Sequence, residues 1–140
     1  MSSVDPATIV HLNVHSWYSL LSATAPVEAL AARAAQDGMA YLALTDANVL
    51  YGAVAFQRAC QAVDVHPIIG MTATMEAPNG MALHQSPGEL TLLATGPEGY
   101  RSLCRLSSTL QGTPARAGIF AARLTWDELK THQQGLLCLS

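Results

Sequence analysis

The sequence carries little charge, and positive charge is the scarcer kind. Only 12% of its 140 residues are charged, and seven Lys and Arg stand against ten Asp and Glu, so the formal net charge is -3 and the pI is about 5.9. Proteins that attract nucleic acids through their surface field concentrate basic residues instead. We therefore expect no direct nucleic-acid contact from this segment.

Long apolar runs and paired cysteines are also missing. No stretch approaches the roughly 18 apolar residues of a membrane span, and the first ten residues, MSSVDPATIV, lack the basic and apolar regions of a secretory signal. Cys60, Cys104 and Cys138 lie far apart, and no CxxC pair occurs. We interpret them as buried free thiols of a cytoplasmic protein that contacts no membrane.

The sequence does contain enough apolar residues, half of the total, for one domain with a core. Periodicity predicts strands at 8–14, 41–45, 65–75, 89–95 and 135–140, helices at 26–36, 51–62, 97–110 and 125–132, and loops at 77–88 and 111–118. Capping-box pairs open the last two helices, Thr95 with Glu98 and Thr125 with Glu128. The alternation of strands and helices indicates a parallel α/β architecture. Because a closed barrel of such units takes about 250 residues, we expect part of a barrel or an unusually small sheet.

Three short motifs carry a family resemblance. Residues 11–16 (HLNVHS) with 18–21 (YSLL), residues 45–48 (TDAN) and residues 67–70 (PIIG) resemble, in order and spacing, the first motifs of the PHP (polymerase and histidinol phosphatase) domain. Residues 92–94 and 98–100 resemble the version found in bacterial DNA polymerase III α subunits, and residues 101–105 lean toward the error-prone paralogue. The resemblance implies that residues 1–140 are the first half of a distorted PHP-type (β/α)7 barrel. It also implies a parent protein that is a DNA-directed DNA polymerase, a nucleotidyltransferase of DNA replication or of lesion-tolerant synthesis.

The metal centre of that family should begin with two histidines on one strand. Alternate residues of a strand point the same way, so an HxH pair can hold one metal ion. In this sequence the pair is Asn13 and His15. The neutral amide oxygen of Asn13 is a poorer ligand for zinc or manganese than an imidazole.

Other ligand positions implied by the resemblance have also changed. The family has an acid after the YSLL run, a histidine after Thr-Asp, an acid two residues after the glycine of the third motif, and often a histidine at the start of the following strand. This chain has Ser22, Ala47, Thr72 and Glu89 at these positions. Glu89 could substitute as a ligand, but His15 is the only clear surviving ligand type. We interpret Asp46, at a strand-to-helix junction, as a helix cap.

Arg101 and Arg105, spaced i,i+4 on a predicted helix, are interpreted as a solvated face and not as a phosphate clamp. His132 is interpreted as a surface residue. No phosphate-cradling GxxxxGK[ST] loop occurs.

These observations predict a non-catalytic PHP segment with a degenerate metal site, no catalytic residue and no cofactor. Its expected partners are the remainder of the polymerase α subunit and a proofreading exonuclease that docks on the domain. One alternative is an active PHP phosphoesterase or 3′–5′ exonuclease that uses zinc or manganese and depends on His15. Another is a small α/β protein that only binds a partner or self-associates through exposed strand edges.

Overall fold

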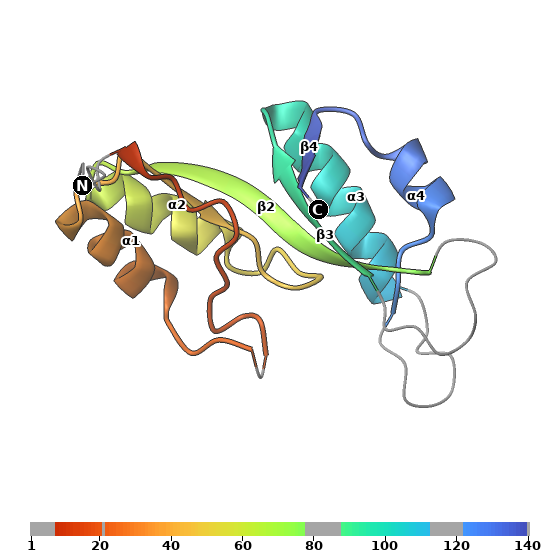
Figure 1. Ribbon diagram of the computed structural model, residues 1–140, viewed down its shortest axis with the longest axis horizontal. Coiled ribbons are helices and arrows are strands. Elements are labelled where there is room, and N and C mark those ends of the chain that lie inside the picture. The colour runs from red at the N-terminus through yellow and green to blue at the C-terminus, as the bar shows by residue number, and fades with distance from the viewer. Residues whose placement is uncertain (1–7, 21, 78–87, 113–121, 140) are drawn as a thin grey trace, which may run out of the picture.

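The computed structural model describes residues 8–20, 22–77, 88–112 and 122–139. Its elements follow in the order α1 (Val27–Gln36), β1 (Tyr41–Leu44), α2 (Ala53–Ala62), β2 (His66–Met75), β3 (Gly88–Ala94), α3 (Pro97–Gly112), α4 (Trp126–Thr131) and β4 (Leu136–Leu139) (Figure 1). All four predicted helices and four of the five predicted strands are therefore confirmed. Most of the two predicted loops, at 77–88 and 111–118, lies outside the described residues.

The strand predicted at residues 8–14 is wrong. The segment makes a single parallel bridge, His11 to Leu42, and then leaves the ladder. The Ala43 amide donates to the His11 carbonyl (3.0 Å), but the Thr45 amide donates to the carbonyl of Val14 (2.8 Å), one residue beyond the regular partner. The Val14 amide in turn donates to the Thr45 hydroxyl (2.9 Å). An extra residue on one side of a ladder is a bulge, and it ends regular pairing here.

The sheet is mixed, so the predicted parallel architecture is only partly correct. The strand order is β1-β2-β3-β4, with β1 and β2 parallel and the other two pairs antiparallel. Parallel strands need a crossover, which α2 supplies between β1 and β2. No helix of the described chain separates β2 from β3, and these strands run antiparallel. The described residues thus form a mixed α/β fold with a four-stranded sheet.

Strand β2 joins the two halves of the sheet and changes partner at Gly70. Ile69 is the last β2 residue that pairs with β1, and Gly70 is the first that pairs with β3. A Cβ atom at Gly70 would lie 2.6 Å from the Leu92 carbonyl oxygen and 2.9 Å from the Cγ2 of Thr45. Both neighbouring segments therefore approach so closely that only glycine fits at this position.

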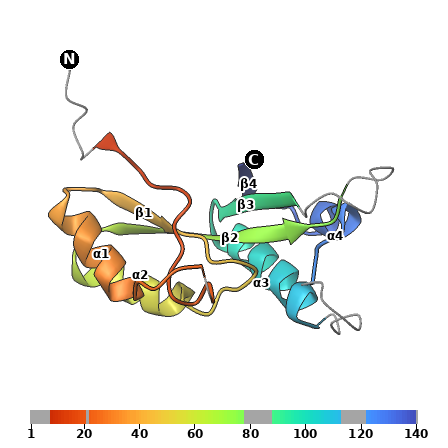
Figure 2. The ribbon, with the colours of Figure 1, turned by 60° about the horizontal axis from the view of Figure 1, so that its bottom comes forward.

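Two apolar clusters hold the helices against the sheet. One lies between α1, α2 and β1 and includes Phe56 and Cys60, which are 0% exposed. The other lies between α3 and strands β2 and β3 and includes Met71 and Leu103. Figure 2 shows α1, α2 and α3 on the same side of the sheet. Burial of a side chain such as Phe56 contributes about 1.5–3 kcal/mol, so each helix is held mainly by its apolar face.

The helix termini and cysteines test further predictions. Thr125 and Glu128 form the predicted capping box at α4. At the start of α3, where the second capping box was predicted, the Thr95 hydroxyl donates to the Gly135 carbonyl (2.9 Å). The prediction of buried thiols holds for Cys60 and is wrong for Cys138, which is exposed on β4. Within the part of the chain that the structure describes, no helix is long and apolar enough to cross a membrane.

Candidate functional site

Three of the predicted site residues meet beside the carboxyl end of β1. Asn13 and His15 belong to the N-terminal segment, and Thr72 lies on β2. The Asn13 amide oxygen accepts from the hydroxyls of Thr45 (3.0 Å) and Thr72 (3.5 Å). The His15 Nε2 lies 3.1 Å from the Thr72 hydroxyl. The tertiary structure therefore connects all three predicted positions through side-chain hydrogen bonds.

The Thr72 hydroxyl contacts three polar groups at once. It lies 3.1 Å from the His15 Nε2, 3.0 Å from the Thr45 carbonyl oxygen and 3.5 Å from the Asn13 amide oxygen. A hydroxyl has one proton to donate, and the tautomer of His15 decides whether Nε2 donates to Thr72 or accepts from it. In both cases the imidazole is held by a neutral hydroxyl group and not by a carboxylate.

Asp46 lies one residue beyond Thr45, and it is buried with 2% of its surface exposed. Its Oδ1 accepts from the Ser16 amide (2.6 Å) and the Ser19 hydroxyl (2.7 Å), and its Oδ2 accepts from the Ser16 hydroxyl (2.7 Å). The predicted role as a helix cap is wrong, because α2 begins later and its N-cap, Gly52, receives no side-chain hydrogen bond. Donors from the turn at 16–19 occupy both oxygens of the carboxylate instead. Asp46 therefore ties the N-terminal segment to the end of β1.

The remaining predicted positions take no part in the hydrogen bonds that link Asn13, His15 and Thr72. Ala47 forms a bridge with Thr72, and its amide donates to the Ser19 hydroxyl (3.0 Å), but its methyl group offers no ligand. Ser22 is exposed and donates its amide to the Ser19 carbonyl (3.0 Å). Glu89 is exposed on β3, opposite Thr74. Across the described ranges, no three His, Cys, Asp or Glu residues are placed so that they could hold a metal ion.

Sequence reasoning assigned no role to Ser16, Ser19 or Asn48. Asn48 adopts a left-handed backbone conformation with φ of 60°, which Asn tolerates better than most residues. Its side chain pairs with Thr74 of β2 through both polar atoms, at 2.8 and 2.9 Å. Two features of the sequence could have pointed to these residues: the spacing of three between Ser16 and Ser19, and the position of Asn48 two residues after Asp46. Their partners lie on other segments, so spacing alone could not identify them.

Comparison with protein families identifies the fold. Residues 11–140 match the family model for the PHP domain. The chain belongs to the PHP domain family. Among solved structures, this PHP domain is similar to an amidohydrolase from Chromobacterium violaceum, with a TM-score of 0.56 and 20% identity over 74% of this chain and 34% of that one. This likeness supports the fold alone.

Curated relatives of this PHP domain are bacterial polymerases. The chain is 40% identical over 133 residues to the DNA polymerase III subunit alpha of Bacillus subtilis (strain 168), covering 95% of this chain and 11% of that protein. It is 46% identical over 99 residues to an error-prone DNA polymerase of Symbiobacterium thermophilum, covering 71% of this chain and 8% of that protein. The chain thus spans about a tenth of the length of these relatives, and both polymerase types are among them.

Proposed function

We propose that this chain is the front part of the PHP domain of a bacterial DNA polymerase III α-type subunit, and that this domain has lost its metal chemistry. DNA synthesis would belong to the rest of the subunit. The PHP domain would serve as a structural element and as a docking site for a proofreading exonuclease. The similarity to polymerase α subunits across 95% of the chain supports the parent. The hydrogen-bond network of Asn13, His15 and Thr72, which includes no carboxylate, supports the loss of metal chemistry.

The donors at this site do not fit the metal centre of a PHP phosphoesterase. Zinc and manganese centres are built from imidazoles, thiolates and carboxylates. Here an amide, a hydroxyl and a methyl group stand at Asn13, Thr72 and Ala47, which leaves one imidazole, His15. The carboxylate of Asp46, the residue that follows Thr45, already accepts three hydrogen bonds. A metal ion would have to displace these bonds and would still lack strong ligands.

The same residues are well suited to a structural role. Asn13 and His15 join the N-terminal segment to Thr45 and Thr72, and Asp46 fastens the turn at 16–19 to the end of β1. All these bonds link segments that lie far apart in sequence. A former ligand position that makes such a bond keeps the fold intact without any hydrolytic activity.

Metal content per chain tests the proposal. The chain would be equilibrated with zinc or manganese, desalted, and analysed by inductively coupled plasma mass spectrometry. We expect far less than one ion per chain. The matched variant Asn13→His/Ala47→His/Thr72→Glu restores imidazoles and a carboxylate on the same backbone, and we expect it to retain more metal.

Retention of one or more ions by the unaltered chain, lost in His15→Ala, would contradict the proposal and favour an active phosphoesterase.

The docking role has a separate test with the full-length α subunit. We expect it to elute with a proofreading exonuclease subunit in size-exclusion chromatography. Separate elution would remove the docking role and leave the structural role standing.

A further inference from the structure

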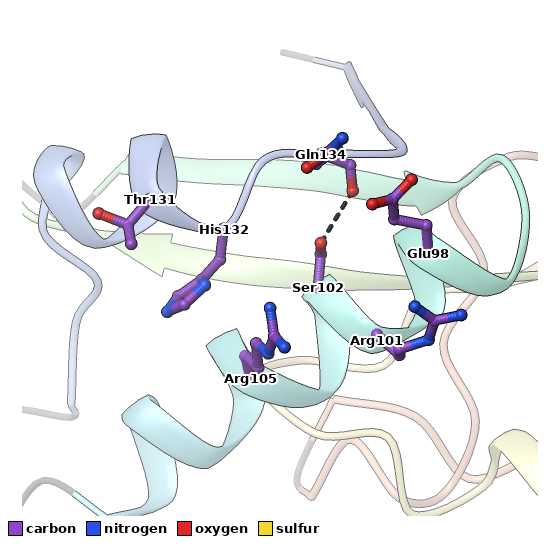
Figure 3. A pocket seen from close by; sticks show the side chains of 7 residues that line it. All are labelled: Glu98, Arg101, Ser102, Arg105, Thr131, His132 and Gln134. Carbon is purple, nitrogen blue, oxygen red and sulfur yellow. Dashed lines mark hydrogen bonds between the residues drawn. The ribbon is translucent and has the colours of Figure 1, made fainter.

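A second site lies on the opposite part of the sheet, between α3 and the segment that joins α4 to β4. Arg101, Ser102 and Arg105 line one wall of a pocket with a volume of about 140 Å3, and His132 and Gln134 line the other (Figure 3). Figure 3 shows the side chains of Arg105 and His132 extending into the space between the two walls. The predicted solvated face of α3 is thus one side of a pocket.

The pocket gathers positive charge in an acidic chain. It holds two of the seven Lys and Arg residues, whereas the chain has a net charge of -3. Glu98 is the one carboxylate among the lining residues. In the described parts of the chain, the salt bridges are Arg33–Asp37 and Lys130–Asp127, so neither pocket arginine is neutralised by an ion pair there. Both guanidinium groups therefore keep their hydrogen-bond donors available for an anion.

The two walls are fixed to each other. The Ser102 hydroxyl donates to the Gln134 carbonyl (2.8 Å). The Thr95 amide and hydroxyl both donate to the Gly135 carbonyl, each at 2.9 Å. A Cβ atom at Gly99 would overlap that carbonyl oxygen, so α3 is in backbone contact with the residue that precedes β4. A site whose walls are already in place loses little conformational entropy when a ligand binds.

We propose that this pocket binds a phosphate group. A guanidinium fork pairs with two phosphate oxygens at once, and the imidazole of His132, which extends into the same space from the facing wall, offers a further donor. The volume suits the group: a cavity of about 150 Å3 holds benzene, with its six heavy atoms, and a phosphate has five. The phosphate could be a free anion or part of a nucleic-acid backbone. The proposal does not depend on the fate of the metal site.

Titration of the isotope-labelled chain with inorganic phosphate, at constant ionic strength balanced with chloride, tests this site by NMR. We expect saturable shifts of the amides near Arg105 and His132. Arg105→Gln should weaken binding about tenfold or more, because a charge-assisted hydrogen bond is lost. Arg58→Gln is the matched control, since it removes an exposed arginine from α2, away from the pocket. It should change binding less than about twofold by screening arguments.

Two results would overturn the proposal: shifts that never saturate, or equal weakening by the Arg58 and Arg105 variants. Arg105 is exposed, so its substitution should leave the fold intact, and amide shifts far from the pocket would verify this. A short single-stranded oligothymidylate then separates the two sources of phosphate. If it competes with phosphate and depends on Arg105, the ligand is a backbone phosphodiester. If phosphate binds and the oligonucleotide does not compete, the ligand is a free anion.

Discussion

Replacement of Asp46 by Ala would remove one acceptor group that serves three hydrogen bonds. The lost bonds come from the Ser16 amide, the Ser16 hydroxyl and the Ser19 hydroxyl, at 2.6 to 2.7 Å. Both serines are buried, with 0% and 1% exposure, so water cannot replace the acceptor without opening the turn. The hydrogen bonds from residues 16–19 to the end of β1 would then be reduced to the bond between Ala47 and Ser19.

The size of the effect follows from the chemistry of these bonds. A hydrogen bond to a charged group contributes about 1.5–3 kcal/mol, and a buried donor left without a partner costs about 1–3 kcal/mol. The three bonds share one carboxylate and are not additive. We expect Asp46→Ala to lower the free energy of unfolding by about 3–5 kcal/mol. Against a total of about 5–15 kcal/mol for a domain, this would be a large loss.

The variant Asp46→Asn removes the negative charge of the side chain but keeps its shape. An amide oxygen in place of Oδ1 can still accept from the Ser16 amide and the Ser19 hydroxyl. The amide nitrogen in place of Oδ2 would require the Ser16 hydroxyl to turn and accept. We expect a smaller loss of about 1–2 kcal/mol, because geometry is kept and only charge assistance is lost.

Urea denaturation followed by circular dichroism measures both variants. Asp127→Ala is the control, because this carboxylate is 95% exposed and its bridge to Lys130 spans 3.8 Å. It should change the free energy of unfolding by less than about 0.5 kcal/mol. If Asp46→Ala and Asp46→Asn were equally mild, both below about 1 kcal/mol, the carboxylate would not hold the turn and the structural role of the site would lose its main support.

Two further predictions test the packing. Burial raises the pKa of the Cys60 thiol from 9.0 to about 11, so the thiol of the unfolded chain ionises first as the pH rises. The contribution of Cys60 to the free energy of unfolding is therefore fully present below pH 9 and should fall by about 2 kcal/mol by pH 11. Urea titrations of the chain and of Cys60→Ala at several pH values would measure this loss. A loss of equal slope in both would contradict this origin. Gly99→Ala should cost about 2–4 kcal/mol in thermal unfolding, since its Cβ would overlap a backbone oxygen of the β4 segment, whereas Gly96→Ala, with open space around it, should be nearly neutral. Equal melting temperatures for the two variants would show that α3 and β4 do not touch as described.

The local elements could be predicted because their signals are local. Val27, Ala31 and Ala34 recur at helical spacing and are buried on α1, and Thr125 and Glu128 form their capping box within four residues of chain. Apolar runs such as 41–45 likewise predicted buried strands, since burial on the sheet requires apolar residues there. The segment at 8–14 is also rich in apolar residues, yet the bulge at Val14 depends on its neighbour in space and left no local signal.

Residue types and motif order, which are properties of the sequence, determined the family. They also showed that Asn13, Ala47 and Thr72 are weak ligands or none. Tertiary structure decided what these positions do instead: Thr72 contacts His15 across 57 positions of chain, and Asp46 receives its donors from Ser16 and Ser19. It likewise decided that Arg101 and Arg105 line one pocket together with His132. Hydrogen bonds and pockets between distant segments arise from chain topology, and periodicity reports only on neighbours within a turn or a strand.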